Sequence, residues 1–244
     1  MIYVGYEPLN VLKEVARDVW IVDGPEIRFR LGPLNIPFPT RMTVIRLPSG
    51  GLWLHSPVAW DEALANELAQ LGPVAHLVAP NSIHYWWIRD WSSRFPAATI
   101  WAVPQLAPGA EERVPAHRKL ESAAPAEWEN AIDQVIVAGS RITEADFFHR
   151  PSRTLILADL IENFERNRFR SAFYRGLAHL GGTVDPDGKL PRELRRTFTK
   201  APFKAAVEQM LRWSPERIII AHGRWYPTDA CHELRRAFRW LLQK

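Results

Sequence analysis

The sequence predicts a single α/β domain, and three observations support this fold class. Short β-like runs alternate with amphipathic helical runs along nearly the whole chain. Of the 244 residues, 47% are hydrophobic and 24% are charged, which is typical of a globular protein with a sizeable core. The single cysteine, Cys231, excludes an intramolecular disulfide and a cysteine-rich zinc module.

The first half of the chain predicts strands that lead into amphipathic helices. In order, we expect strands at 18–23, 41–47 and 51–56, a helix over 60–71, a strand at 74–79, a helix over 86–95 and a strand at 99–103. Gly50 and Gly51 indicate a hairpin turn between the second and third strands. The first helix has Leu64 and Leu68 on one face, and Gly72 follows its end.

The second half begins with a loop over 104–130, which is rich in Pro, Ala and Glu. We then expect strands at 131–138, 145–149 and 154–160, a mostly helical stretch over 161–213, a strand at 217–221 and a closing helix over 229–242. The helical stretch 161–213 interrupts the strand pattern. We therefore expect one domain over residues 1–244, with 161–213 as a helical insertion.

Charge and hydropathy narrow the possible partners. The chain shows no secretory leader and no apolar run near the roughly 20 residues that span a bilayer, so we expect a cytoplasmic protein with no membrane partner. Residues 161–244 hold 17 Lys/Arg against 9 Asp/Glu, a net charge of +8. Such a basic third could attract an anionic substrate or nucleic acid, although its basic runs are short.

Histidine and aspartate residues lie at the ends of several predicted strands. The strand at 74–79 leads to Asn81 and His84, the strand at 154–160 reaches Asp159, and the strand at 217–221 leads to His222. His149 closes another predicted strand. Loops at strand ends carry function in α/β folds, so these side chains are candidate site residues.

The order of these features resembles the metallo-β-lactamase superfamily. In that superfamily a hairpin and helix precede a strand that ends in an H-x-H-x-D-H loop, and a lone histidine, an aspartate and a last histidine follow. The resemblance covers most of residues 18–225, and the motifs LWLHSP at 52–57 and VAPN at 78–81 resemble an uncharacterised branch. It implies an αββα sandwich, with His84, His149, Asp159 and His222 as candidate metal ligands.

The H-x-H-x-D-H loop is degenerate in this chain. If His84 matches the last histidine, then Ala79 and Asn81 replace the first two histidines and Ile83 replaces the aspartate. Likewise His55 replaces an aspartate that the superfamily has on an early strand. The remaining donors suffice for one metal ion and not for two.

Three functions remain open at this point. The first is a hydrolase-related protein with an at most mononuclear site for zinc, iron or manganese, acting on a small-molecule ester, thioester, lactone or amide. The second is a non-catalytic small-molecule binding protein on the same fold, in which the polar cluster holds no metal. The third and least favoured is a nucleic-acid-binding protein that uses the basic C-terminal third. The sequence indicates no oligomeric state.

Tryptophans directly follow His84 in the sequence. Trp86, Trp87 and Trp91 lie in one predicted helix, where the last two share a face. They either pack this helix on the sheet or form an aromatic wall beside the site.

Overall fold

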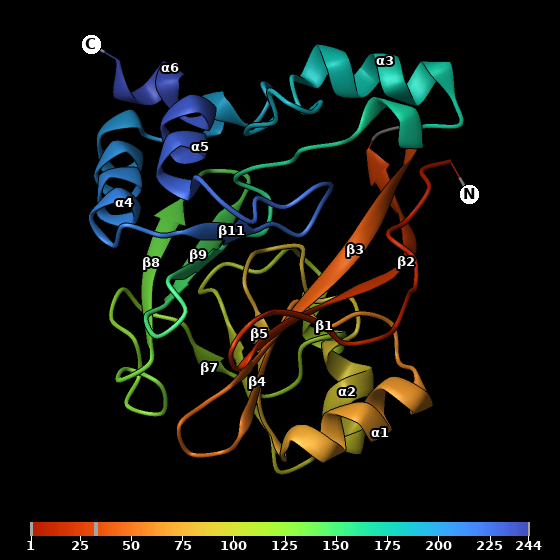
Figure 1. The fold of residues 1–244 in the computed structure, drawn as a ribbon, viewed down its shortest axis with the longest axis vertical. Helices are drawn as coiled ribbons and strands as arrows, with labels where there is room; N and C mark the ends of the chain where they lie inside the picture. The colour runs from red at the N-terminus through yellow and green to blue at the C-terminus, as the bar shows by residue number, and fades with distance from the viewer. Residues whose placement is uncertain (1, 32–33, 244) are drawn as a thin grey trace.

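The computed structural model describes residues 2–31 and 34–243. Figure 1 shows two β-sheets between helices, with the N-terminal sheet running from the lower part to the upper right and the C-terminal sheet at the upper left. The seven-stranded sheet runs in sequence order: β1 (Lys13–Ala16), β2 (Val19–Leu31), β3 (Leu34–Arg46), β4 (Leu52–His55), β5 (Val74–Ala79), β6 (Thr99–Ala102) and β7 (Arg118–Lys119). Its first four strands are antiparallel neighbours, and β4 to β7 run parallel.

The second sheet has four strands in the order β11-β10-β9-β8. These are β8 (Ile132–Ala138), β9 (Thr143–His149), β10 (Thr154–Ile156) and β11 (Arg217–Ile219). β9 pairs antiparallel with both β8 and β10, whereas β10 and β11 run parallel. The loops that leave β10 and β11 therefore emerge at the same edge of the sheet.

The fold has four layers, in the order helices, first sheet, second sheet and helices, and a hydrophobic core lies between each two neighbouring layers. One core packs α1 (Glu62–Leu71) and α2 (Ile88–Arg94) against the outer face of the first sheet. A second core lies between the sheets and includes Trp53 and Phe147. A third packs α4 (Lys200–Arg212), α5 (Ala230–Ala237) and α6 (Arg239–Leu242) against the second sheet. This arrangement confirms the predicted αββα sandwich.

The β2–β3 hairpin is much longer than the sequence pattern predicts. Its strands have 13 residues each. The predicted strands at 18–23 and 41–47 cover only the ends that lie away from the hairpin turn. Prolines obscured the pattern: Pro37 and Pro39 lie within β3, and Pro25 lies at a register shift in β2. Proline lacks the N–H that a sheet ladder needs and so argues against a strand.

Residues 161–213 are less helical than predicted. α3 (Ala172–Gly181) and α4 are joined by irregular chain with short 3-10 turns at Arg166–Arg168 and Arg195–Thr197. α4 packs on β8 as part of the sandwich, whereas α3 lies at the end of the β2–β3 hairpin (Figure 1). In the described part of the chain, no helix is long and apolar enough to cross a membrane.

Candidate metal centre

Three loops that follow parallel strands bring His84, Asp159 and His222 together. His84 lies five residues after β5, while Asp159 and His222 each lie three residues after β10 and β11. The three residues are nearly fully buried, with exposed fractions of 9%, 4% and 4%. They could together hold a metal ion. The site thus lies where the carboxyl ends of strands from both sheets meet.

The donor atoms form a nearly regular triangle. Nε2 of His222 lies 3.1 Å from Oδ1 of Asp159, and Nε2 of His84 lies 3.3 Å from the same oxygen. The two Nε2 atoms are 3.1 Å apart. Donors around a tetrahedral zinc ion with bonds of about 2.0–2.1 Å are separated by about 3.3 Å. The triangle is therefore close to the size that one such ion needs.

Outer contacts fix how both imidazole rings face this triangle. Nδ1 of His222 donates a hydrogen bond to the Pro39 carbonyl oxygen at 2.7 Å. Nδ1 of His84 lies 2.7 Å from Oγ of Ser56. Ser56 has φ +51°, a left-handed conformation that is costly for a residue with a side chain. In both rings Nδ1 is engaged, which leaves Nε2 to face the site.

Asn81 and Glu144 hold the two loops that carry the candidate ligands His84 and Asp159. Nδ2 of Asn81 donates to Glu144 and to Oδ2 of Asp159, while its Oδ1 accepts from the backbone N–H of Ile83 and of His84. The Glu144 carboxylate accepts the backbone N–H groups of Ala158, Asp159 and Leu160. Asn81 therefore links the two loops, and if His84 matches the last histidine of the superfamily pattern, Asn81 stands where that pattern has a histidine.

Charges at the site favour an ionised Asp159. Burial alone would raise the pKa of Asp159, but His84 and His222 outweigh it and hold that pKa below its usual range. In return, Asp159 raises the pKa of His84 against the opposing effect of burial. Burial and the Asp159 charge both raise the pKa of Glu144. The site therefore has one ionised carboxylate, that of Asp159, beside the imidazole rings of His84 and His222.

The donor set fits a bound cation. Because Nδ1 of His222 donates to a carbonyl, the neutral ring has its lone pair on Nε2, which faces the Asp159 oxygen. Two lone pairs at 3.1 Å repel unless a proton or a metal ion lies between them. Imidazole nitrogens and a carboxylate oxygen are ligands that zinc, iron and manganese accept.

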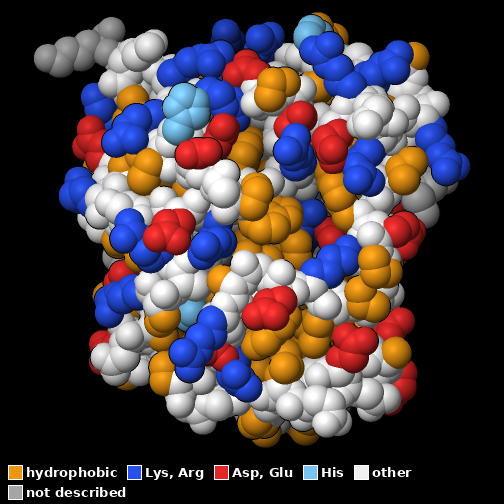
Figure 2. All heavy atoms as spheres, viewed as in Figure 1, with side chains coloured by type: hydrophobic (Ala, Val, Ile, Leu, Met, Phe, Trp, Pro, Cys, Tyr) orange, Lys and Arg blue, Asp and Glu red, His pale blue; other side chains and the backbone are white. Residues whose placement is uncertain are grey.

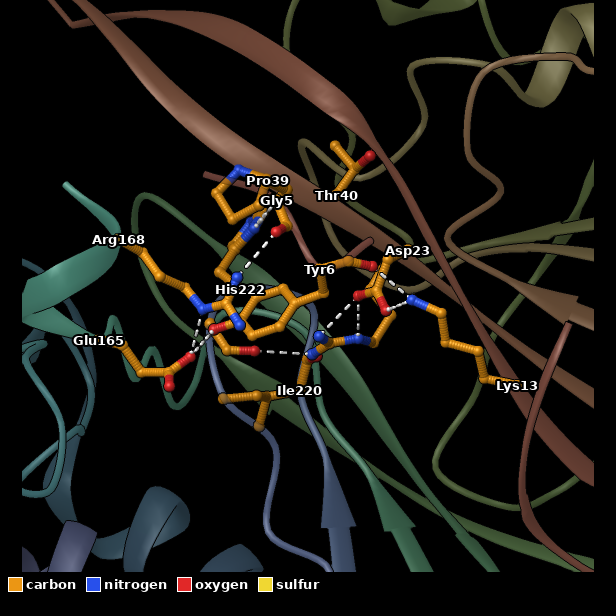
Figure 3. Close-up of polar contacts among 12 residues, drawn as sticks. Gly5, Tyr6, Lys13, Asp23, Pro39, Thr40, Glu165, Arg168, Ile220 and His222 are labelled. Carbon is orange, nitrogen blue, oxygen red and sulfur yellow. Dashed lines mark hydrogen bonds and ion pairs between the residues drawn. The ribbon is translucent and has the colours of Figure 1, made fainter. Parts of the chain in front are cut away.

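A buried ionic network supports the His222 loop from β2 and β3. Arg41 is paired with Asp23 at 2.7 Å, and its Nη1 donates to the carbonyl oxygens of Ile220 and Gly223, on either side of His222. Lys13 also contacts Asp23, at 2.8 Å. Figure 3 shows Asp23 and Lys13 on one side of His222, and a separate ion pair of Glu165 with Arg168 on the other side.

The structure does not bring His149 to the site, which corrects the expectation that four side chains converge. His149 pairs with Thr154 at the start of β10, whereas Asp159 follows the end of that strand. Its Nδ1 contacts Ser152 instead, at 2.7 Å. β9 runs antiparallel to β10, so a histidine at the end of β9 lies at the opposite edge of the sheet.

Trp87 and Trp91 pack in the core, whereas the ring of Trp86 lies under the Arg113 guanidinium. Trp91 is fully buried against the first sheet and donates to the Val58 carbonyl, and Trp87 packs on the same core. The ring of Phe38 does lie beside a candidate ligand, with its centroid 5.0 Å from that of His222. His55 is also buried, and its Nε2 has no hydrogen-bond partner among the described residues. Burial lowers the pKa of His55 to about 3, so it is a neutral ring.

A family model described as "Domain of unknown function (DUF4336)" matches residues 18–172, which is more than half of the chain. The chain belongs to the DUF4336 family. No curated protein matches this DUF4336 sequence.

Solved structures show the fold of this DUF4336 chain. A metallo-β-lactamase from Pontibacter korlensis is 11% identical, with a TM-score of 0.59 over 96% of this chain and 99% of that one. FIM-1 from Pseudomonas aeruginosa, solved in a mono-zinc form, is 10% identical, with a TM-score of 0.58 over 96% of each chain. The Flv1 flavodiiron core from Synechocystis, a metal-soaked structure, is 12% identical, with a TM-score of 0.63 over 99% of this chain and 62% of that one. The DUF4336 chain has the metallo-β-lactamase fold.

Several residues that support the site were not assigned a role from the sequence. Ser56 and Asn81 lie inside the quoted motifs, but the contact of Ser56 with His84 and those of Asn81 with Glu144 and Asp159 depend on how distant segments pack. Arg41 and Asp23 lie within predicted strands, but only the structure shows that both charged side chains are buried.

Proposed function

We propose that this DUF4336 protein is a metal-dependent hydrolase with one metal ion, held by His84, Asp159 and His222. The observation that carries the proposal is the triangle of donor atoms, with edges of 3.1, 3.1 and 3.3 Å. The mono-zinc form of FIM-1 and the metal-soaked flavodiiron core are metal-containing relatives in fold and support the same assignment. We propose a single ion because Ala79, Asn81 and Ile83 stand where the superfamily pattern has further donors.

When bound, such an ion polarises a carbonyl group and lowers the pKa of water. The side chains and backbone of the protein attract the ion and orient the groups that hold it. Asp159 supplies the negative charge that attracts a cation, and the Pro39 and Ser56 contacts orient the two imidazoles. Asn81 keeps the Asp159 and His84 loops in register through hydrogen bonds to both. The ring of Phe38 beside His222 favours a substrate with an apolar group next to its carbonyl.

The test begins with elemental analysis of protein purified without a metal-affinity tag. We expect about one equivalent of zinc, iron or manganese per chain. The loaded protein is then assayed against a small panel that contains one ester, one thioester, one lactone and one amide, each with an apolar acyl group. Turnover of one of these classes that is lost with a chelator and restored by the metal would support the hydrolase.

Two other outcomes would decide against it. A stoichiometric metal without turnover of any class would indicate the non-catalytic binding protein. If the protein takes up no metal when zinc, iron or manganese is added, we would infer that a proton links His222 and Asp159, and the proposed metal-dependent hydrolysis would be ruled out.

A further inference from the structure

Helix α3 exposes apolar side chains to solvent. It buries none of its residues, and the two large hydrophobic residues that are exposed in the described part of the chain, Phe173 and Leu180, both lie on it. Their exposed fractions are 56% and 68%. Residues seven apart share one face of an α-helix, and half-buried Leu177 lies between them on that side. Single exposed hydrophobic residues are ordinary, but a concentrated apolar stripe marks an interaction surface.

Helix α3 and the turn before it form a strongly basic segment. Residues 166–181 contain four arginines and no Asp or Glu. Arg166, Arg170 and Arg175 are exposed, and no ion pair holds their side chains among the described residues, whereas Arg168 pairs with Glu165. Figure 2 shows Lys and Arg side chains gathered over the upper part of the molecule, where Figure 1 places α3.

The exposed arc of α3 carries both kinds of side chain, with the apolar pair at one edge and Arg175 about 160° away at the other edge. At 100° per residue, the exposed arc of α3 runs from Phe173 and Leu180, past Ala172 and Gly176, to Arg175. The small residues in the middle of this arc let the helix backbone lie close to a surface. An apolar edge beside a cationic edge is typical of helices that lie in the interface of a lipid bilayer.

We propose that α3 docks the protein on an anionic phospholipid bilayer surface. Phe173 and Leu180 enter the acyl boundary, and Arg170 and Arg175 contact the headgroup phosphates. A folded partner usually needs about 800 Å² on each side, and a helix of ten residues is only about 15 Å long. A fluid lipid surface needs no such area and no matching shape. The proposal revises the expectation of no membrane partner.

Helix α3 contacts the same strand, β3, that carries Phe38 beside the candidate metal centre. Oη of Tyr174 on α3 donates to the Asn35 carbonyl oxygen on β3 at 3.0 Å. Phe38, three residues along β3 and so about 10 Å away, contacts the ring of His222. Docking through α3 would thus bring the centre close to the lipid surface. The docking itself does not depend on metal binding or hydrolysis.

The experiment is co-sedimentation of the full chain with vesicles. One set contains phosphatidylcholine alone, and the other contains phosphatidylcholine with a quarter phosphatidylglycerol. We expect binding to the anionic set only, with affinity falling as salt rises. Replacing Phe173→Ser and Leu180→Ser together should weaken binding about tenfold or more. The pair Arg170→Ser and Arg175→Ser should weaken it by a similar factor and flatten the salt dependence.

The matched control removes two exposed arginines elsewhere, with Arg212→Ser on α4 and Arg235→Ser on α5, and should leave binding within about twofold. Thermal unfolding of each variant confirms that it is folded. No binding to anionic vesicles at low salt would overturn the proposal, as would equal binding by the Phe173/Leu180 variant. A dimer that forms through α3 without vesicle binding would assign the stripe to a second copy of the chain.

Discussion

The carbonyl oxygen of Pro39 accepts the Nδ1–H of His222 at 2.7 Å, and this contact determines which ring nitrogen faces Asp159. Pro39 lies in β3, two residues before Arg41, whose guanidinium binds the backbone on both sides of His222. One strand of the first sheet therefore holds both the ring and the backbone of a candidate ligand that follows a strand of the second sheet. The site depends on packing between the sheets as much as on the three candidate ligands.

The first prediction concerns Asp159, the only anionic donor of the triangle. Asp159→Ala should lower the affinity for zinc by more than about 100-fold, because it removes a ligand and the charge that offsets the cation. His149→Ala should leave zinc affinity within about twofold, since His149 lies at the opposite edge of the sheet. Competition with a fluorescent chelator measures both affinities. An equal loss of zinc affinity in the Asp159 and His149 variants would contradict the assignment of Asp159 as a ligand.

The site could be predicted in part, because the strand ends are visible in the sequence. The runs before His84, Asp159 and His222 are short and apolar, and parallel strands place such ends together. His149 looks the same in sequence, but its position depends on the antiparallel pairing of β9 with β10, which no local pattern reveals.

The long hairpin was likewise hidden, because prolines in β2 and β3 mask an alternating strand. The contacts of Arg41 join residues about 180 positions apart, and only the folded chain brings them together.

The second prediction concerns the buried ion pair of Arg41 with Asp23. Arg41→Met should lower the free energy of unfolding by about 3–5 kcal/mol, because it leaves Asp23 with Lys13 alone and two carbonyls without their donor. Arg46→Met on the same strand removes an exposed pair with Asp18 and should cost less than about 1 kcal/mol. Urea unfolding of both variants measures the difference. Similar losses would show that the buried network contributes no more than a surface pair.

The third prediction concerns Gly223, which follows His222. Its φ is +93°, and a Cβ there would lie 2.1 Å from the Asn163 carbonyl oxygen. Gly223→Ala should therefore lower the free energy of unfolding by more than about 2 kcal/mol and weaken metal binding, because the His222 loop must move. Gly50 also has a positive φ, of +84°, but open space around it. Gly50→Ala should cost only about 1 kcal/mol in a urea titration. A Gly223 variant as stable as the Gly50 variant would argue against the close contact.

The fourth prediction concerns pH and His149, which lies away from the metal centre. Burial lowers the pKa of His149 to about 4, with Asp18 partly opposing, from an ordinary value of 6.5. Between these values the unfolded chain binds more protons than the folded one, so His149 destabilises the fold as the pH falls from about 7 towards 4. His149→Asn removes this effect. The stability of the wild type should therefore fall by about 2 kcal/mol more than that of the variant between pH 7 and pH 5.

Urea unfolding at both pH values measures this difference for His149. His55 and His76 have lowered pKa values too. Because the wild type and the His149→Asn variant both contain these two histidines, their effects on stability cancel when the two proteins are compared. His179→Asn, at an exposed position of α3, serves as the control and should follow the wild type at both pH values. If the His149 variant and the wild type lost stability in parallel, the folded chain would have to protonate His149 as readily as the unfolded chain does. That outcome would mean that the ring is solvated rather than buried at the end of β9.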